Sequence, residues 1–356
     1  DSVSDQTVSV TTTDDDVAGF TIAVTDGSTS VDESGNTDTF TVVLDAQPDT
    51  DVVFTITSSD TGEATVTSAL TFTNGNWDTP QTVTVTGVDD NLIDGTISST
   101  ITVSINDGSS DNNFDALADQ TVTATTTDDD TAGFIIVESG GSTAVAESGT
   151  TDTFTVVLDA QPDTDVVFAI TSSDTGEATV NTPLTFTSAN WDTPQTVTVT
   201  GVDDNIIDGN IDSTLTISVV DALSDNNFDG VADQTVTATT TDDDVAGFTI
   251  AESGGSTSVA ESGTTDTFTI VLDAQPASDV VFDITSSDTG EATVTSALTF
   301  TSSNWNTPQT VTVTGVDDSV IDGTISSTIT ITVDDANSDN NFDSVVDQTV
   351  TAATTD

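Results

Sequence analysis

The sequence lacks every basic side chain. Among 356 residues there is no Lys, Arg or His, while Asp and Glu together number 62. The formal net charge at pH 7 is −62, and no ion pair between side chains can form. Each carboxylate must face water, accept hydrogen bonds or meet a cation from solution. Repulsion of this size excludes nucleic acids and anionic membrane surfaces as partners.

Cysteine is absent as well, which excludes disulfides, thiol nucleophiles and zinc–thiolate sites. The absence of histidine removes imidazole bases, histidine-ligated metals and Ser-His-Asp triads. No apolar run approaches the roughly 20 residues that a membrane-spanning helix needs. The chain begins with Asp1 rather than Met, and no signal peptide precedes it, so we expect a processed or excerpted polypeptide.

The sequence is a repeat of 114 residues, in which Trp77, Trp191 and Trp305 occupy the same position of successive repeats. The segment TTTDDD at 11–16 returns on the same period. Three repeats do not account for the whole chain, and a short segment is left over. The first residues, DSVSDQTVSVTTTD, match the last ones, DSVVDQTVTAATTD at 343–356. The first residues therefore correspond to the end of a unit.

The repeat divides the chain into three units and a short leading segment. Residues 1–13 are the last strand of a preceding repeat or, alternatively, a terminal strand exchanged with a neighbouring subunit. The sequence leaves both alternatives open. The three units are residues 14–127, residues 128–241, and residues 242–356, the last including the first Asp of a further junction.

Apolar and polar residues alternate with a period of two through each unit, which predicts β-strands and no helix. Turn-forming residues separate the strands. In the first unit we predict strands at 20–24, 39–46, 51–59, 63–73, 81–88, 99–105 and 119–126.

About seven short strands in roughly 100 residues are typical of an immunoglobulin-like sandwich. The predicted fold class is therefore all-β: tandem immunoglobulin-like β-sandwiches of about seven strands each, on the 114-residue repeat. We expect the core of the first unit to contain Phe20, Phe40, Phe54, Phe72 and Trp77.

Three acidic motifs occur in the same order in each unit. They are an early Glu-Ser-Gly, the segment GVDDNLIDGT at 87–96 or its counterpart, and a closing Asp triplet. The third unit keeps only the first residue of this triplet, Asp356. In this arrangement the chain resembles the Calx-beta-type repeats of large bacterial surface proteins, over nearly the whole of each unit. The resemblance implies a seven-stranded sandwich that binds Ca²⁺ through acidic loops at one tip, next to the following domain.

The resemblance assigns candidate calcium ligands by position. The acidic residue after the Asp pair is the least certain of them, because its Ile-Asp-Gly context also fits a β-turn. The candidates are the early Glu (Glu33, Glu147, Glu261), a mid-chain loop Asp (Asp60, Asp174, Asp288), the Asp pair (Asp89, Asp90, Asp203, Asp204, Asp317, Asp318), the residue after it (Asp94, Asp208, Asp322) and the triplets (Asp14, Asp15, Asp16, Asp128, Asp129, Asp130, Asp242, Asp243, Asp244).

Electrostatics leads to a similar expectation. Two carboxylates about 4 Å apart repel by roughly 1 kcal/mol in water and roughly 4 kcal/mol at an effective dielectric near 20. Without basic residues, converging acidic loops must splay into water or bind a cation. Ca²⁺ accepts about six to eight oxygens in irregular geometry, whereas Mg²⁺ demands a regular octahedron. The alternative is that each triplet is a solvated linker that holds neighbouring units apart.

The segment SDNNFD at 110–115, 224–229 and 338–343 offers alternating Asp and Asn oxygens. It lacks the central Gly and the distant Glu of an EF-hand loop. It is either a second calcium site or a polar loop closed by a packed Phe, and we favour the loop.

These observations predict an extracellular or cell-surface structural protein: a stalk or filament whose junctions are made rigid by Ca²⁺, with copies of itself or neighbouring repeats as partners. The alternative is an adhesin module that binds a carbohydrate or another surface, with a surface glycan as its partner. Trp77, Trp191 and Trp305 could stack on a sugar, but the segment NWDTPQ fits an anchor of a loop better. Hydrolysis by paired carboxylates is least favoured, because near-identical copies of one active site would repeat along one rod. We therefore do not expect an enzyme.

Overall fold

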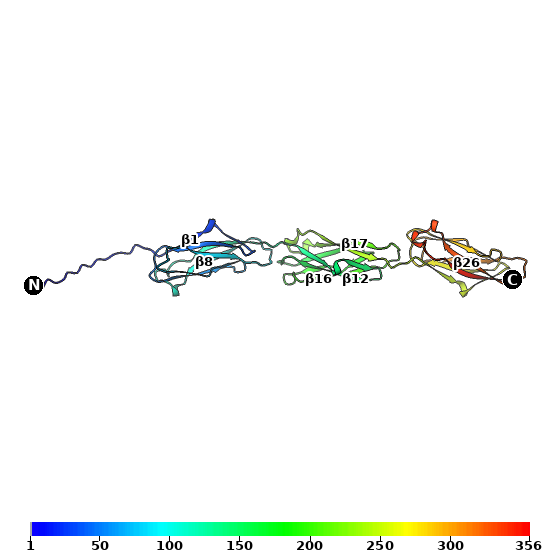
Figure 1. The fold of residues 1–356 in the computed structure, drawn as a ribbon, viewed down its shortest axis with the longest axis horizontal. Helices are drawn as coiled ribbons and strands as arrows, with labels where there is room; N and C mark the ends of the chain where they lie inside the picture. Colours follow the sequence, from blue (N-terminus) through cyan, green and yellow to red (C-terminus); the bar gives the residue numbers. More distant parts are fainter. Residues whose placement is uncertain (1) are drawn as a thin grey trace.

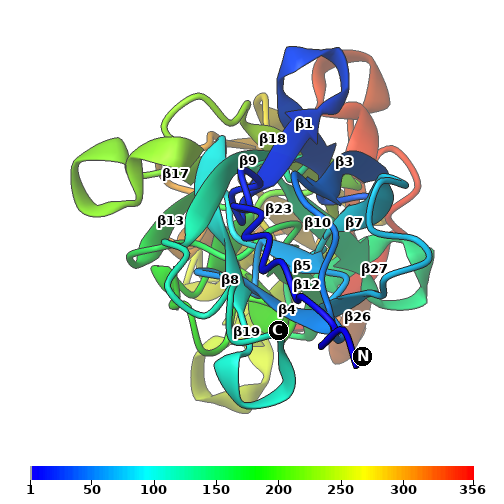
Figure 2. The ribbon, with the colours of Figure 1, turned by 90° about the vertical axis from the view of Figure 1, so that its left-hand side faces the viewer.

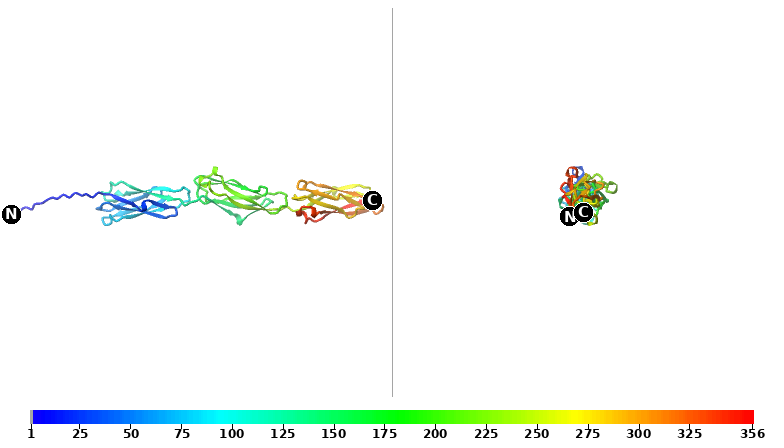
Figure 3. Two further views of the ribbon diagram at one scale, coloured as in Figure 1. Left: turned by 90° about the horizontal axis from the view of Figure 1, so that it is seen from above. Right: turned by 90° about the vertical axis from the view of Figure 1, so that its right-hand side faces the viewer.

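Three β-sandwiches follow one another along a single long axis in the computed structural model, which describes residues 2–356. The residues before the first sandwich extend away from it along the same axis (Figures 1 and 3). Viewed along that axis, the three units lie behind one another (Figure 2). The 114-residue repeat of the sequence is thus a repeat of one folded unit.

Each unit contains the same series of short strands within the described residues. The first has β1 (Phe20–Val24), β2 (Thr29–Asp32), β3 (Thr37–Leu44), β4 (Val52–Ser58), β5 (Ala64–Val66), β6 (Ala69–Phe72), β7 (Gln81–Gly87), β8 (Ile97–Ile105) and β9 (Gln120–Thr127). The second has β10 (Phe134–Glu138), β11 (Thr143–Ala146), β12 (Thr151–Leu158), β13 (Val166–Ser172), β14 (Ala178–Val180), β15 (Leu184–Phe186), β16 (Gln195–Gly201), β17 (Ile211–Val219) and β18 (Gln234–Thr241). The third has β19 (Phe248–Glu252), β20 (Thr257–Ala260), β21 (Thr265–Leu272), β22 (Val280–Ser286), β23 (Ala292–Val294), β24 (Ala297–Phe300), β25 (Gln309–Gly315), β26 (Thr324–Val333) and β27 (Gln348–Thr355).

Two sheets pack face to face in every unit. In the first unit the four-stranded sheet has the order β1-β3-β7-β5 and the five-stranded sheet the order β2-β9-β8-β4-β6. All pairs are antiparallel except β2 with β9, which run parallel. The start of the unit therefore switches sheets: β1 lies in one sheet and β2 in the other. The fold is an all-β tandem of immunoglobulin-like sandwiches, as predicted.

The number of strands differs from the prediction, because each unit has nine shorter strands among residues 2–356 instead of about seven. The predicted strand at 63–73 is divided, since β5 pairs with β7 in one sheet and β6 pairs with β4 in the other. Apolar and polar residues keep alternating where the chain passes from one sheet to the other, so the sequence pattern does not show that the strand is divided. The sequence pattern also places β2 in a turn, because its parallel partner β9 is distant in sequence and leaves no local signal.

Aromatic side chains fill the centre of each sandwich, as expected. Phe40, Phe54 and Phe72 are fully buried and Phe20 is 5% exposed. The ring of Phe54 meets those of Phe20 and Phe72 edge to face, with centroids 5.0 and 5.7 Å apart. Trp77 is half-buried against the same core, and its carbonyl accepts a hydrogen bond from Leu44 N (3.2 Å). It is an anchor at the rim of the core.

The SDNNFD segment forms a loop held by its own Asp. Asp111 Oδ2 accepts hydrogen bonds from the backbone N–H groups of Asp49 (2.7 Å) and Thr50 (3.0 Å), and Oδ1 accepts from Asn113 N (2.9 Å). The bond from Asn113, followed by that from Thr50, lowers the pKa of Asp111, because such bonds favour the ionised carboxylate. Phe114 beside it is buried. The geometry matches the loop interpretation.

Residues 2–19 form no helix or strand, and β1 begins at Phe20. All three sandwiches contain their own last strand, which is β9, β18 or β27. The assignment of residues 1–13 to a strand of a preceding repeat, or to a strand exchanged with a neighbouring subunit, stays a prediction, and Asp1 lies outside the described residues. None of the helices in residues 2–356 has the length and apolar character needed to cross a membrane.

Candidate metal centre

Two glutamates are placed by backbone hydrogen bonds at the end of the first sandwich. Glu33 follows β2, and its N–H donates to Thr127 O (3.2 Å) beyond the end of the parallel ladder. The carbonyl of Glu63, just before β5, accepts from Val88 N (2.9 Å) and from Thr126 Oγ1 (3.3 Å). Both side chains are buried, with 1% and 6% exposed. The sheet ladders thus hold two carboxyl groups at the same end of the unit.

The loop 88–96, which joins β7 to β8, adds further carboxylates at this end. Asp90 Oδ1 accepts from Leu92 N (2.8 Å). Asp128, directly after β9, accepts from Gly95 N through Oδ2 and from Asp130 N through Oδ1, both at 2.8 Å. These bonds tie the end of β9 to loop 88–96 and turn the carboxylate of Asp130 towards the buried glutamates.

Carboxylate oxygens converge in two groups per unit in the first two sandwiches. Within each group the oxygens lie no more than 4.8 Å from one another, and the early Glu belongs to both groups. The third unit has a single group among the described residues. The groups are Glu33, Glu63 and Asp94; Glu33, Asp90 and Asp130; Glu147, Glu177 and Asp208; Glu147, Asp242 and Asp244; and Glu261, Glu291 and Asp322.

Other predicted ligands lie outside these groups, and their role stays a prediction. Asp60 caps a turn by accepting from Gly62 N (3.0 Å), although its charge still helps to raise the pKa of Glu63. Asp14, Asp15 and Asp16 are exposed in front of the first sandwich. The remaining candidates outside the groups are Asp89, Asp128, Asp129, Asp174, Asp203, Asp204, Asp243, Asp288, Asp317 and Asp318.

Sequence reasoning missed Glu63, Glu177 and Glu291, because it selected the Asp three residues earlier in the segment SSDTGE. A signal was present in the sequence. Glu occupies the same repeat position in all three units at only two places, the early Glu and this one. At both places the structure buries the side chain in the acidic cluster.

Burial perturbs the ionisation of the cluster. It raises the pKa of Glu33 to about 7, and the nearby charges of Asp128 and Asp90 contribute in the same direction. The pKa of Glu147 is likewise raised to about 7, chiefly by burial. The pKa values of Glu63 and Asp94 are also raised, again first by burial and then by neighbouring carboxylates. The cluster holds more negative charge than the protein alone stabilises.

Several oxygens of the cluster are buried without any hydrogen-bond partner, namely Glu33 Oε2, Glu63 Oε2, Asp94 Oδ1 and Asp130 Oδ2. An ionised oxygen in this position is costly unless it is paired, and the chain has no basic side chain to pair with it. A hard divalent cation would satisfy these oxygens. Their number, charge and irregular arrangement suit Ca²⁺. The residues present therefore fit a calcium ion, with Glu33 shared between two positions.

A glycine allows the early Glu to reach the cluster. In the second unit Gly201 ends β16, and a Cβ there would lie 2.1 Å from the carbonyl oxygen of Ala146, at the end of β11. Glu147 follows Ala146 directly. Gly87 has the same relation to Asp32 O in the first unit, at 1.9 Å. The close approach of two backbones thus positions the shared ligand.

We expect Gly201→Ala to destabilise the protein by about 1–3 kcal/mol, because overpacking against backbone forces a shift. Calcium binding by the middle unit should weaken as well, since the shift displaces Glu147. Thermal unfolding and calcium titration measure both effects. The matched control is Gly230→Ala, where an added Cβ meets no atom within 4 Å. Equal behaviour of the two variants would contradict this role of Gly201.

Comparison with known proteins gives structural likeness only. No protein-family model matches the sequence, and no curated protein matches it. Among solved structures, the crystal structure of CBD12 from CALX1.2 is 15% identical with a TM-score of 0.24, over 55% of this chain and 79% of that one. An I-band fragment of titin is 9% identical with a TM-score of 0.27, over 95% and 98%. Domains 4–9 of the surface layer protein SbsC are 18% identical with a TM-score of 0.24, over 93% and 49%. At these values the likeness assigns neither a family nor a function.

Proposed function

We propose that the chain is a structural rod outside the cell, part of a stalk or filament, in which Ca²⁺ makes the junctions between sandwiches rigid. One observation carries the proposal. Loop 88–96 contributes Asp90 and Asp94 to the acidic cluster, and the three residues between them contact the next sandwich. Metal ligands and junction contacts therefore share one short segment.

The contacts of this segment are specific. Asn91 O accepts a hydrogen bond from Gln161 N of the second unit (2.7 Å). Ile93 packs against the core of the second unit, and its carbonyl accepts from Asn227 Nδ2 (2.9 Å). The second junction repeats them: Asn205 O accepts from Gln275 N (2.6 Å), Ile207 packs against the third core, and Asn341 Nδ2 donates to Ile207 O (2.9 Å).

Ion binding and junction order are coupled through this loop. Without a cation, the carboxylates around Glu33 repel one another and favour conformations in which loop 88–96 moves outward. A ligand that binds only the ordered state stabilises it by RT ln(1 + [L]/Kd), about 2.7 kcal/mol at a hundredfold excess. Calcium would therefore hold the loop in the form that docks on the next unit, and its removal would turn the junction into a hinge.

The composition supports the proposed location. We expect the affinity of extracellular calcium modules, with dissociation constants of about 10⁻⁴–10⁻³ M, so that the sites would fill where calcium is millimolar. The absence of Lys and Arg leaves no cleavage site for trypsin-like proteases. Strong negative charge also opposes aggregation of exposed fibres. The glycan-binding alternative stays a prediction, since the half-buried Trp77 packs against the core.

Small-angle X-ray scattering tests the proposal. In roughly 5 mM calcium, above the expected dissociation constant, we expect the profile of a straight rod, and in EGTA the profile of a chain with flexible joints. Asn227→Ala and Asn341→Ala remove a junction hydrogen bond each and no carboxylate. Together they should loosen the rod even in calcium. A profile unchanged by EGTA, in a protein shown by calorimetry to bind calcium, would refute the calcium-dependent rigidity.

A further inference from the structure

We propose that the second unit contributes a carboxylate, that of Asp163, to the cation position that the first unit forms around Asp94. This position also contains Glu33 and Glu63. A calcium ion at the first junction is then held by two sandwiches at once. The second junction lacks the contact, because Ala277 occupies the repeat position of Asp163. The inference rests on the calcium-dependent rod proposed above and gives that rod two junctions of different strength.

A parallel β-bridge at the first junction directs the two segments towards each other. Leu92 of the first unit pairs with Gln161 of the second, and Gln161 N donates to Asn91 O (2.7 Å). Asp94 and Asp163 each lie two residues beyond this bridge. In extended segments every second side chain points to the same side, and here both segments run in the same direction. Their course therefore brings Asp163 towards Asp94.

The charge of Asp163 reaches the acidic cluster of the first unit. Burial raises the pKa of Asp94 most, and the charges of neighbouring carboxylates, Asp163 among them, raise it further. Burial and nearby carboxylates also raise the pKa of Asp208, the counterpart of Asp94, but Ala277 adds no charge at that junction. Two carboxylates that approach each other without a basic side chain repel, and a shared Ca²⁺ reverses the sign of their interaction.

The loop that carries Asp163 is fixed on both sides of this residue. Pro162 is buried, and its ring restricts the backbone. Thr164 N donates a hydrogen bond to Asp225 Oδ2 (2.9 Å). Asp163 itself is exposed on the loop. A carboxylate presented by a fixed loop loses little conformational freedom when it binds an ion.

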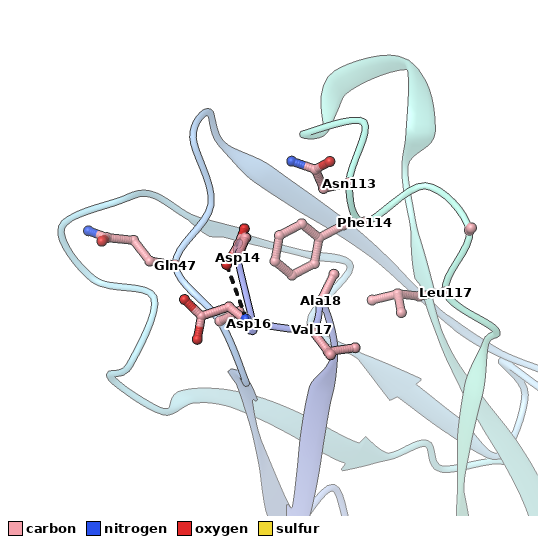
Figure 4. A pocket seen from close by; sticks show the side chains of 10 residues that line it. Asp14, Asp16, Val17, Ala18, Gln47, Asn113, Phe114 and Leu117 are labelled. Atoms are coloured by element: carbon pink, nitrogen blue, oxygen red, sulfur yellow. Dashed lines mark hydrogen bonds between the residues drawn. The ribbon is translucent and has the colours of Figure 1, made fainter. Parts of the chain in front are cut away.

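The same face of the first unit shows how this loop adjoins the segment that enters a sandwich. Gln47, at the start of the equivalent loop, lines one cavity with Asp14 and Asp16 of the entering segment, as Figure 4 shows. The counterparts of these residues at the first junction are Gln161, Asp128 and Asp130. The loop of Asp163 therefore begins beside the segment that carries the closing carboxylates of the cluster.

The two junctions are expected to differ although their hydrogen bonds are the same. An additional carboxylate ligand raises the affinity for calcium, and it adds repulsion when the ion is absent. We expect the first junction to become rigid at a lower calcium concentration than the second. In EGTA the first junction should be the more flexible of the two.

Spin labels measure each junction separately in the complete chain, which has no cysteine of its own. Thr71, Thr185 and Thr299 are exposed at the same repeat position, on β6, β15 and β24. Thr71→Cys with Thr185→Cys reports on the first junction, and Thr185→Cys with Thr299→Cys reports on the second. The width of the distance distribution between two labels measures the flexibility of that junction. A calcium titration of this width gives a midpoint for each junction.

Two substitutions exchange the residues of the two junctions. Asp163→Ala should raise the midpoint of the first junction roughly tenfold, because a ligand is lost, and should narrow the distribution there in EGTA. Ala277→Asp should lower the midpoint of the second junction by a similar factor. The control Asp49→Ala removes a carboxylate from the equivalent loop of the first unit, outside the acidic groups, and should change neither midpoint. Midpoints that neither Asp163→Ala nor Ala277→Asp changes would overturn the inference.

Calorimetric titration of the same variants separates this inference from the proposed rod. Weaker calcium binding by Asp163→Ala, in chains whose distance distributions calcium does not narrow, supports the ligand and refutes only the calcium-dependent rigidity. The opposite result is narrowing by calcium at both junctions with unchanged affinity in Asp163→Ala and Ala277→Asp. It refutes the ligand and leaves the rod in place.

Discussion

Replacing Glu147 by Gln is expected to weaken calcium binding by the middle unit roughly tenfold or more, since a ligand carboxylate is lost. The same change is expected to stabilise the calcium-free protein. Glu147 is 1% exposed, its pKa is raised to about 7, and its Oε1 has no hydrogen-bond partner. A neutral amide removes a buried charge that nothing compensates, an effect on the order of 1–3 kcal/mol. A metal ligand is expected to show both effects, weaker calcium binding and a more stable calcium-free protein. A residue that only packs in the interior is not expected to show this combination.

Two variants serve as controls for Glu147→Gln. Glu138→Gln makes the same chemical change at a residue that accepts a hydrogen bond from Thr143 (2.9 Å) and lies outside the acidic groups. It should leave calcium affinity unchanged. Glu261→Gln in the third unit should have a smaller effect, because that residue belongs to a single group. Calorimetric titration and thermal unfolding in EGTA provide the measurements. Unchanged affinity in Glu147→Gln, or a lower melting temperature in EGTA, would contradict the assignment.

Raising the pH from about 5.5 to about 7.5 is expected to lower the melting temperature of the calcium-free chain. A carboxyl group with a raised pKa in the folded state holds its proton more tightly there than in the unfolded chain. Its contribution to stability is complete below the unfolded value near 4.5 and is lost as the pH rises through about 7, the value for Glu33 and Glu147. With excess calcium the trend should reverse, because protons compete with the ion for the same oxygens.

The pH window isolates the buried glutamates from the remaining carboxylates. Asp111, whose pKa is lowered, stabilises the fold above its unfolded value near 3.8, and this contribution is lost only as the pH falls below it. Salt screens the mutual repulsion of exposed carboxylates, so the measurement is made at moderate ionic strength. Glu147→Gln should reduce the slope in EGTA between about pH 5.5 and 7.5. A flat profile there would refute the proposed protonation of the cluster.

The sequence by itself determined the repeat, the β class and most of the strands. Val and Thr alternate at a period of two, and a β-strand places all the Val side chains of such a segment on one face, where they can be buried. The exact recurrence of Trp and Asp positions is sufficient to divide the chain into units. The resemblance to Calx-beta-type repeats placed Glu33, Asp90 and Asp130 among the candidate ligands. The absence of basic side chains supported the expectation of a cation, because converging carboxylates must then face water or bind one.

Only the tertiary structure decided how the cluster is built and what adjoins it. Glu63 enters the cluster because β5 and β6 belong to different sheets, and the parallel pairing of β2 with β9 brings Glu33 beside it. These are contacts between segments far apart in sequence, which local alternation does not encode. The residues Asn91–Ile93 resemble part of an acidic turn when the sequence alone is considered, and the next sandwich covers them in the folded chain. Their function depends on a surface that another unit supplies.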